Sequence, residues 1–251
     1  MSQSKRELRA ERKAAREAQE RAAAQAEARR RRTWRLLGVT AIAAIAVAVA
    51  AAVSASGGSN PSAVKTGDAA KLVAGIPEKD GVLGDQNAPI TVTEYLDLQC
   101  PICAEASKTA LPHLINTYVK TGKVKLQART LSFIGPDSVK AAKFAAGAAQ
   151  QGKLWAFLET FYASQGTENS GYVTDDFLTD VANAAGVDAK QASAYARGDG
   201  AQQALDTADG DAQAIGVDST PSFTMKKGDG PEKVIAVGTG DLQANLDKAL
   251  S

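Results

Sequence analysis

The feature that most constrains the fold is a strand-like segment that ends at the only two cysteines of the 251-residue chain. From residue 90 to residue 98, apolar side chains alternate with more polar ones, which is the period of a β-strand with one buried face. The alternating apolar positions are Ile90, Val92, Leu96 and Leu98. The segment leads into Cys100-Pro101-Ile102-Cys103. This pattern predicts a strand that runs directly into a helix.

Pro101 indicates where that helix begins. Proline is favoured at the first helical position, because its missing N–H group would have no helical partner there. We therefore expect Cys100 at the N-cap and Cys103 one turn into the helix. Free N–H groups and the positive end of the helix dipole stabilise a thiolate at the N-cap, which lowers the thiol pKa and makes Cys100 reactive. Cys103 can then close a disulfide with it.

Two other interpretations of the cysteine pair are weaker. A structural zinc site needs four ligands, and the only histidine, His113, lies ten residues after Cys103. We therefore expect no metal site, and we interpret His113 as a surface or packing residue. A purely structural disulfide would close a very short loop, so it would restrict the unfolded chain little and would add little stability. Redox chemistry explains the pair better.

Glu94 is a further candidate site residue. It lies on the same face of the predicted strand as Val92 and Leu96. A carboxylate on a buried apolar face costs free energy unless it has a use. The alternative is a glutamate that points outward from a twisted strand.

The N-terminal region has its own charge pattern. Residues 1–35 carry twelve Lys or Arg and five Glu, and no apolar face. Residues 36–53 are apolar except for Gly38 and Thr40, and this run is just long enough for a membrane-spanning helix. Because basic residues crowd only its N-terminal side, the positive-inside rule predicts a cytoplasmic tail and an extracytoplasmic C-terminal domain. A cleaved signal peptide is the alternative. We expect no nucleic-acid partner.

The rest of the chain is predicted to be a linker and one domain. Residues 54–81 begin with Ser, Gly, Asn and Pro and are predicted to be a flexible linker. Residues 82–251 are long enough for one domain with its own core. Further strands are expected over residues 124–129, 222–226 and 233–237, and a last helix over residues 241–250.

A helical insert is expected over about residues 137–216. Its helices are predicted over residues 139–150, from residue 154 and from Thr174, with another after a hinge at Gly198 and Gly200. Asp137-Ser138 is the predicted cap of the first of these helices. In the helix that follows Cys103, Pro112 predicts a kink.

Thr220-Pro221 directly precedes the strand expected over residues 222–226. A proline at the first residue of a strand lacks the ladder N–H group, and X–Pro bonds adopt the cis form far more readily than other peptide bonds. We therefore expect a cis peptide here.

The order of these elements resembles the thioredoxin fold with the helical insertion of the DsbA family. Three segments carry the resemblance: Glu94 to Cys103, residues 140–157 and residues 216–223. The resemblance implies an α/β fold in which Cys100 attacks, Cys103 resolves, and Glu94 exchanges the proton of Cys103. It also implies a substrate-binding surface, made by Pro101, Ile102, Thr220 and Pro221. Many members of the family have histidine where this chain has Ile102.

These observations together predict a membrane-anchored thiol–disulfide oxidoreductase. It would donate disulfides from Cys100 and Cys103 to reduced secreted or cell-envelope proteins, without a cofactor. A membrane redox partner would reoxidise the pair. A reductase or isomerase running in the reverse direction is one alternative, and a peptide-binding module with a structural disulfide is another.

Overall fold

The computed structural model of the chain describes residue 64, residues 70–238 and residues 242–250. The predicted basic tail and the predicted membrane-spanning segment, residues 36–53, lie outside this described part. Within it, no helix has both the length and the apolar character that crossing a membrane requires.

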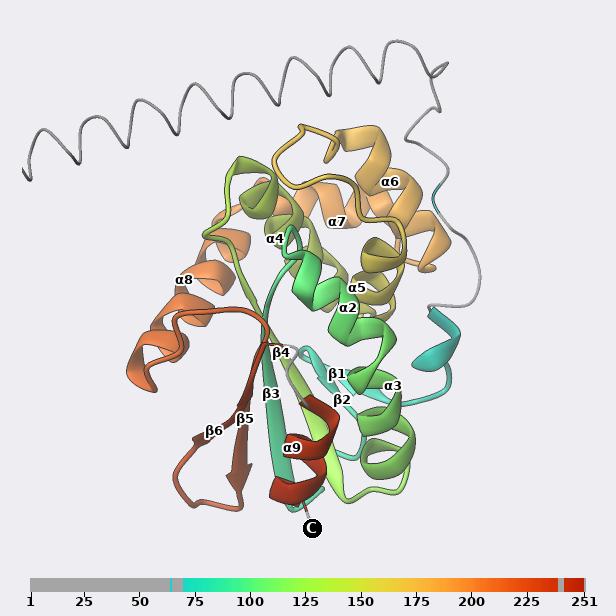
Figure 1. The fold of residues 1–251 in the computed structure, drawn as a ribbon. Coiled ribbons are helices and arrows are strands. Elements are labelled where there is room, and N and C mark those ends of the chain that lie inside the picture. The colour runs from blue at the N-terminus through green and yellow to red at the C-terminus, as the bar shows by residue number, and fades with distance from the viewer. Residues whose placement is uncertain (1–63, 65–69, 239–241, 251) are drawn as a thin grey trace, which may run out of the picture. The chain divides into compact units, whose positions relative to one another are not determined.

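The described part contains one mixed sheet with the strand order β1-β2-β4-β3-β5-β6 (Figure 1). β3 pairs in parallel with β4 and antiparallel with β5. The strands are β1 (Glu78–Lys79), β2 (Val82–Leu83), β3 (Ile90–Asp97), β4 (Val124–Leu131), β5 (Ser222–Lys227) and β6 (Lys233–Val237). The four longer strands confirm the prediction, whereas the β1-β2 pair was not predicted.

Helices cover the sheet and form the insertion. They are η1 (Ala70–Leu72), α2 (Pro101–Lys108), α3 (Ala110–Leu114), η2 (Ile115–Val119), α4 (Pro136–Ala149), α5 (Leu154–Ala163), α6 (Asp175–Ala184), α7 (Ala189–Ala196), α8 (Asp199–Ala214) and α9 (Leu242–Leu250). The segment from α4 to α8 separates β4 from β5, which confirms the predicted helical insertion. Figure 1 shows α4 to α7 grouped at the end of the sheet where β3 leads into α2.

The two faces of β3 contribute to different cores. Val92 and Leu96 belong to the main hydrophobic cluster, which also contains buried side chains of α2, α3 and α5. Tyr95 points to the opposite face and packs with Leu131 and Ala208 in a second cluster. Successive side chains of a strand point to opposite faces, so the face that carries Glu94 is the one covered by α2 and α5.

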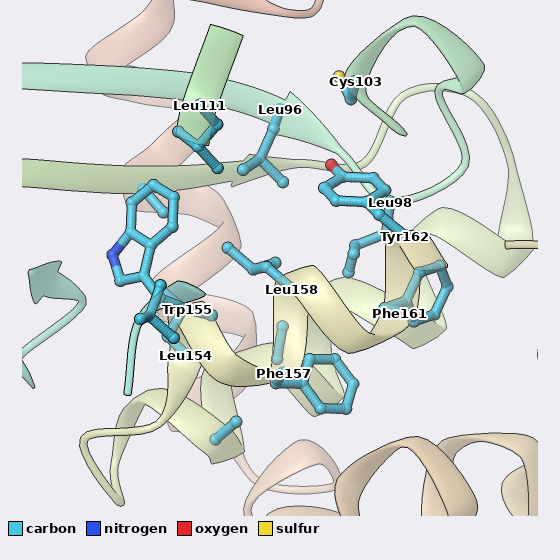
Figure 2. Packing of buried hydrophobic residues seen from close by; sticks show 14 of the residues in the cluster. Leu96, Leu98, Cys103, Leu111, Leu154, Trp155, Phe157, Leu158, Phe161 and Tyr162 are labelled. Carbon is cyan, nitrogen blue, oxygen red and sulfur yellow. The ribbon is translucent and has the colours of Figure 1, made fainter. Parts of the chain in front are cut away.

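α5 joins the insertion to the sheet. Figure 2 shows the side chains of Trp155, Leu158 and Tyr162 directed from α5 toward β3 and α2. Trp155 is fully buried, and its indole Nε1 donates a hydrogen bond of 3.0 Å to the carbonyl oxygen of Gly81. Five further aromatic residues of the insertion contact one another in stacked, tilted and edge-to-face pairs, at distances where rings attract. They are Phe144, Phe157, Phe161, Tyr172 and Phe177.

The first helix of the insertion does not begin as predicted. α4 starts at Pro136 with Gly135 at the N-cap, so the predicted cap at Asp137-Ser138 is wrong. The two side chains bind elsewhere: the Ser138 hydroxyl donates to Asp97 at 2.6 Å, and the Asp137 carboxylate accepts from the Gly171 N–H group at 3.0 Å. Pro136 suits the first helical position for the same reason as Pro101.

The folded domain begins earlier than predicted. η1 and β1 lie within residues 54–81, which were predicted to be a linker. The predicted boundary between linker and domain is therefore too far along the chain. The Glu78 carboxylate accepts hydrogen bonds from the backbone N–H groups of Leu154 and Trp155, at 2.7 and 3.2 Å. These are unpaired N–H groups at the N-terminus of α5. Glu78 therefore caps a helix that lies more than seventy residues downstream.

Three details of the helices differ from or refine the prediction. The helix after Cys103 breaks at Thr109, one turn before Pro112, because Pro112 has no N–H group to offer the Lys108 carbonyl and its ring crowds that carbonyl. Gly200 lies within the first turn of α8 rather than in a hinge. α7 was not predicted as a separate helix, and Ala192 is its one buried residue.

Candidate active site

Cys100 occupies the N-cap of α2, with Pro101 at the first helical position. Its backbone is extended, with φ −71° and ψ 116°, and its carbonyl oxygen accepts a hydrogen bond from the Ala104 N–H group. Cys103 lies one turn further, so both sulfur atoms are on the side of the helix that faces β3. The predicted placement of the pair is confirmed.

The surroundings of Cys100 favour the thiolate. Its pKa is lowered to about 6, chiefly by the Cys103 thiol as a hydrogen-bond donor, against the opposing effect of burial. The Thr220 side chain and the backbone N–H groups of Cys103 and Ile102 lower the pKa further. At neutral pH, Cys100 is therefore mostly in the reactive ionised form.

Cys103 has the opposite character. It is fully buried, and burial raises its pKa well above that of a free cysteine. Hydrogen bonding to Cys100 and the negative charges of Cys100 and Glu94 raise it further. The pair thus consists of an ionised thiol at the surface end of the helix and a protonated thiol beneath it.

Glu94 lies inside the domain, as the strand alternation predicted. The side chain is 2% exposed, and its Oε2 atom has no hydrogen-bond partner. Burial, with a contribution from the charge of Glu159, raises its pKa to about 8. Glu94 therefore carries a proton at neutral pH and can give one to a nearby base. Cys103 lies on α2, which covers the same face of β3, and the charge of Glu94 raises the pKa of Cys103.

The predicted proline loop lies across from Cys100. The Thr220–Pro221 peptide bond is cis, as expected, and the Cys100 thiol lies 3.5 Å from the Thr220 carbonyl oxygen. Antiparallel pairing of Ser222 with Tyr95 brings this loop beside the end of β3. The loop is therefore a second wall of the site, supplied by residues 120 positions further along the chain.

Exposed apolar side chains surround the cysteine pair. Ile102 is 41% exposed at the start of α2. Phe133 and Val237 are 56% and 52% exposed, and sequence reasoning did not select either of them. Phe133 comes just after β4, whose last residue, Leu131, pairs with Asp97 at the end of β3. Val237 pairs with Ser222 at the start of β5. All three side chains thus lie at the end of the sheet that carries Cys100.

The insertion holds the loop before Cys100 through side-chain amides. The Gln165 amide donates to the carbonyl oxygens of Leu98 and Cys100, at 2.8 and 3.2 Å. The Gln99 amide donates to the Tyr172 hydroxyl at 2.8 Å and accepts from the Asn169 N–H group at 3.0 Å. These contacts join residues that are sixty-five or more positions apart, and no local sequence pattern predicts them.

Metal binding has no support in the described part of the chain, where no group of three or more His, Cys, Asp or Glu side chains is placed to hold an ion. The His113 imidazole Nε2 lies 2.7 Å from Asp247 on α9, and the Tyr118 hydroxyl donates to the same carboxylate oxygen. His113 therefore packs α9 against α3, in agreement with its prediction as a packing residue.

The two thiols are expected to differ in their reaction with an alkylating agent. In the reduced protein, modification of Cys100 should be half-maximal near pH 6, because the thiolate is the nucleophile. Cys103 should stay unmodified until the medium is strongly alkaline. Labelling with iodoacetamide across pH, followed by peptide mass spectrometry, measures both. The Cys100→Ser variant provides Cys103 alone, and preferential labelling of Cys103 in the wild type would contradict this assignment.

An ionised cysteine at a helix N-cap, a buried cysteine one turn below it and a cis-proline loop opposite, on a sheet interrupted by helices, define a thioredoxin-fold protein with a CxxC site. The family model described as Thioredoxin matches residues 77–234, and the chain belongs to this family.

Several proteins of known name or structure are similar to the chain. "Probable disulfide bond formation protein D" of Bacillus anthracis is 36% identical over 103 residues, which cover 39% of this chain and 46% of the relative. The chain thus spans about half the length of that curated relative. Oxidised BdbD from Bacillus subtilis has a TM-score of 0.60 at 22% identity, covering 71% of this chain and 95% of BdbD. The thiol-disulfide exchange protein α-DsbA2 from Wolbachia pipientis has a TM-score of 0.55 at 21% identity, over 72% and 89%.

Proposed function

We propose that the chain is an extracytoplasmic thiol–disulfide oxidoreductase, which donates or exchanges disulfides in secreted or cell-envelope proteins. The observation that carries the proposal is the contrast within the cysteine pair. Cys100 has a pKa of about 6, and Cys103 is a buried thiol whose pKa is raised. A pair of this kind has one stable thiolate, which can exchange with a client, and one protected thiol, which can displace a client from the mixed disulfide.

In the donor direction, the cycle starts from the Cys100–Cys103 disulfide. A client thiolate attacks the Cys100 sulfur, the bond to Cys103 breaks, and Cys103 leaves with the electron pair. Glu94, protonated at neutral pH, supplies the proton that neutralises Cys103. A second client thiolate then attacks the client sulfur of the mixed disulfide, and Cys100 leaves as a thiolate. The client loses two electrons and two protons, and the cysteine pair is left reduced.

The low pKa of Cys100 supports donation over the reverse direction. A protein that stabilises its thiolate stabilises its reduced form, and its disulfide is therefore a stronger oxidant. Ile102 adds no positive charge and no imidazole donor, so the thiolate depends on the helix terminus, the Cys103 thiol and Thr220. Because each turnover leaves the pair reduced, the proposal includes a membrane redox partner that reoxidises it. If the membrane partner supplied electrons to the pair instead of removing them, the same pair would act as a reductase or isomerase.

The surroundings of the pair support a client in an extended conformation. Exposed Ile102, Phe133 and Val237 offer apolar contacts, and the backbone of the loop at Thr220 and Pro221 faces Cys100. Extended segments bind to such surfaces through main-chain hydrogen bonds, with side chains in neighbouring apolar sites. Reduced, unfolded clients are extended and expose apolar side chains, so they fit this surface.

The Cys103→Ala variant is expected to accumulate client proteins in mixed disulfides with Cys100. Cys100 can still attack client disulfides, and no second thiol of the enzyme is left to displace the client from the mixed disulfide, so the adduct persists. Gel electrophoresis without reductant, followed by mass spectrometry, identifies the adducts, and the Cys100→Ser variant serves as the control without adducts. Adducts that form through Cys103 in Cys100→Ala would reverse the two roles. Undiminished protection of clients by a variant without cysteines would favour the peptide-binding module.

The proposal places the domain outside the cytoplasm, with residues 36–53 as a single membrane anchor. The support is the concentration of basic residues on the N-terminal side of this apolar run. Protease added to intact cells is expected to digest the domain and to leave the basic tail intact. A protected domain would contradict this topology. A mature protein that begins near Ser56 would show cleavage instead of anchoring.

A further inference from the structure

α5 carries one acidic residue, Glu159, in an otherwise apolar and aromatic sequence. The side chain is 3% exposed, and the reaction cycle above does not use it. Burying a carboxyl group away from water costs free energy unless it is protonated or fully hydrogen-bonded. Its retention in the core of the domain therefore needs a reason other than packing.

Glu159 is held by the helix that carries the cysteine pair. The Ser107 hydroxyl donates a hydrogen bond of 2.8 Å to its Oε2 atom. Ser107 lies four residues after Cys103 on α2, so the two side chains are neighbours on one face of that helix. This contact fixes the Glu159 carboxyl group one helical turn below Cys103, on the side that faces β3.

Glu94 and Glu159 form a pair. In the described part of the chain, two buried side-chain polar atoms lack a hydrogen-bond partner, namely Oε2 of Glu94 and Oε1 of Glu159. The two carboxyl groups approach the same region from β3 and from α5, and the charge of Glu159 acts on Glu94. Ionisation of one buried carboxyl group raises the free energy of the other's charged form, so the two groups do not ionise independently.

The neighbours of Glu94 and Glu159 come from α2, α5 and the adjoining strands. From α2 they are Cys103 and Ser107, and from α5 the Tyr162 phenol, on which the charges of Cys103 and Glu94 also act. The neighbours of Glu94 on the adjoining strands are Ala128 on β4 and Phe223 on β5, and neither carries a charge. The proton of Glu94 therefore has Cys103 as its reacting partner.

We propose that Glu159 is a positioning residue of the redox site: when it ionises above neutral pH, its charge keeps the proton on Glu94 and widens the pH range in which Glu94 can protonate Cys103. The inference rests on the proposed disulfide exchange. When the Cys100–Cys103 bond breaks at neutral pH, the Cys103 sulfur takes the proton of Glu94, and Glu94 becomes a carboxylate while Glu159 stays protonated. When the membrane partner reoxidises the pair, Cys103 gives its proton back to Glu94 as the disulfide forms. Glu159 acts only through Glu94 and touches neither client nor sulfur.

The test follows the ionisation of Glu94 by infrared absorption of protonated carboxyl groups, recorded across pH on the reduced full chain. Loss of a band in Glu94→Gln assigns that band to Glu94. In Glu159→Gln, which preserves the side-chain volume, the Glu94 band is expected to disappear at a pH about one unit lower than in the wild type. Glu105→Gln is the matched control, since Glu105 is exposed on α2, and should leave the Glu94 band unchanged.

The pH profile of client oxidation gives a second readout. Its alkaline limb reports loss of the Glu94 proton, and in Glu159→Gln this limb should move to lower pH by the same amount.

A Glu94 band that does not move in folded Glu159→Gln would overturn the inference. If that variant does not fold, Ser107→Ala replaces it: the loss of a hydrogen bond that favours ionised Glu159 should shift the Glu94 band in the same direction, and an unmoved band again overturns the inference. The band shift requires no exchange, so failure of the mixed-disulfide test would count separately, against the proposed function.

Discussion

Replacing Cys100 with serine is expected to abolish the oxidation of a reduced client protein. The serine hydroxyl cannot form the disulfide that the client attacks, and it does not ionise near neutral pH as the Cys100 thiol does. Loss of an essential nucleophile lowers an enzymatic rate by several orders of magnitude. We therefore expect the rate of client oxidation to fall to that of the uncatalysed reaction. Disulfide formation in a reduced client, followed by thiol titration, measures this rate.

The fold of the variant has to be intact for this comparison. Cys100 belongs to the main hydrophobic cluster, but serine differs from cysteine only by oxygen in place of sulfur, so Cys100→Ser should keep the circular dichroism spectrum of the wild type. Lys108→Ala, at an exposed position on the same helix, is the matched control and should keep its activity. Substantial turnover by Cys100→Ser would show that Cys103 alone supports exchange, and would contradict the assigned roles.

Replacing Trp155 with alanine is expected to lower the free energy of unfolding by about 3–5 kcal/mol. Trp155 is fully buried, and its indole N–H group donates to Gly81 at 3.0 Å. The substitution leaves a cavity between α5 and the sheet and removes one of two hydrogen bonds to the Gly81 carbonyl, which still accepts from the Ala128 N–H group at 3.3 Å. Because domains of this size are marginally stable, this loss is a large fraction of the total. Denaturant unfolding followed by circular dichroism measures it.

Trp155→Phe separates the two contributions. Phenylalanine keeps much of the packing but not the hydrogen bond, so its effect should be clearly smaller than that of alanine. Replacement of exposed Lys190 on α7 by alanine should change the free energy of unfolding by less than about 0.5 kcal/mol. Equal stability of Trp155→Ala and the wild type would show that α5 does not hold the insertion to the sheet.

The parts of the fold that could be predicted are those with a local signal. Period-two alternation identified β3, and the Cys100-Pro101 step identified the start of α2. By contrast, β1 and β2 have two residues each, which is too short for any periodicity. β2 joins the sheet by pairing with β4, which is distant in sequence, and β1 joins it by pairing with β2. The early boundary of the domain was missed for the same reason.

The site could be predicted where its residues carry a local signal, as Thr220-Pro221 do before the strand that follows them. Glu94 has the spacing of a buried acid on the strand. Gln165 reaches Cys100 from a distant loop, and such contacts leave no mark on local sequence. Glu159 had a usable signal, a single carboxyl group in an apolar helix, which is costly unless it is functional. The aromatic stripe around it drew attention to packing instead.

The position of β3 in the sheet has a consequence for the order in which the enzyme matures. β3 and Cys100 leave the ribosome early, but the antiparallel partner β5 and the Thr220 carbonyl follow 120 residues later. Contacts of such long sequence separation form late, because the intervening chain has to be present and its closure entropy offset. Until then Cys100 lacks the hydrogen bond of the Thr220 side chain that lowers its pKa, and β3 lacks its antiparallel partner. The difference in pKa between the two thiols is therefore complete only when synthesis of the domain is nearly finished.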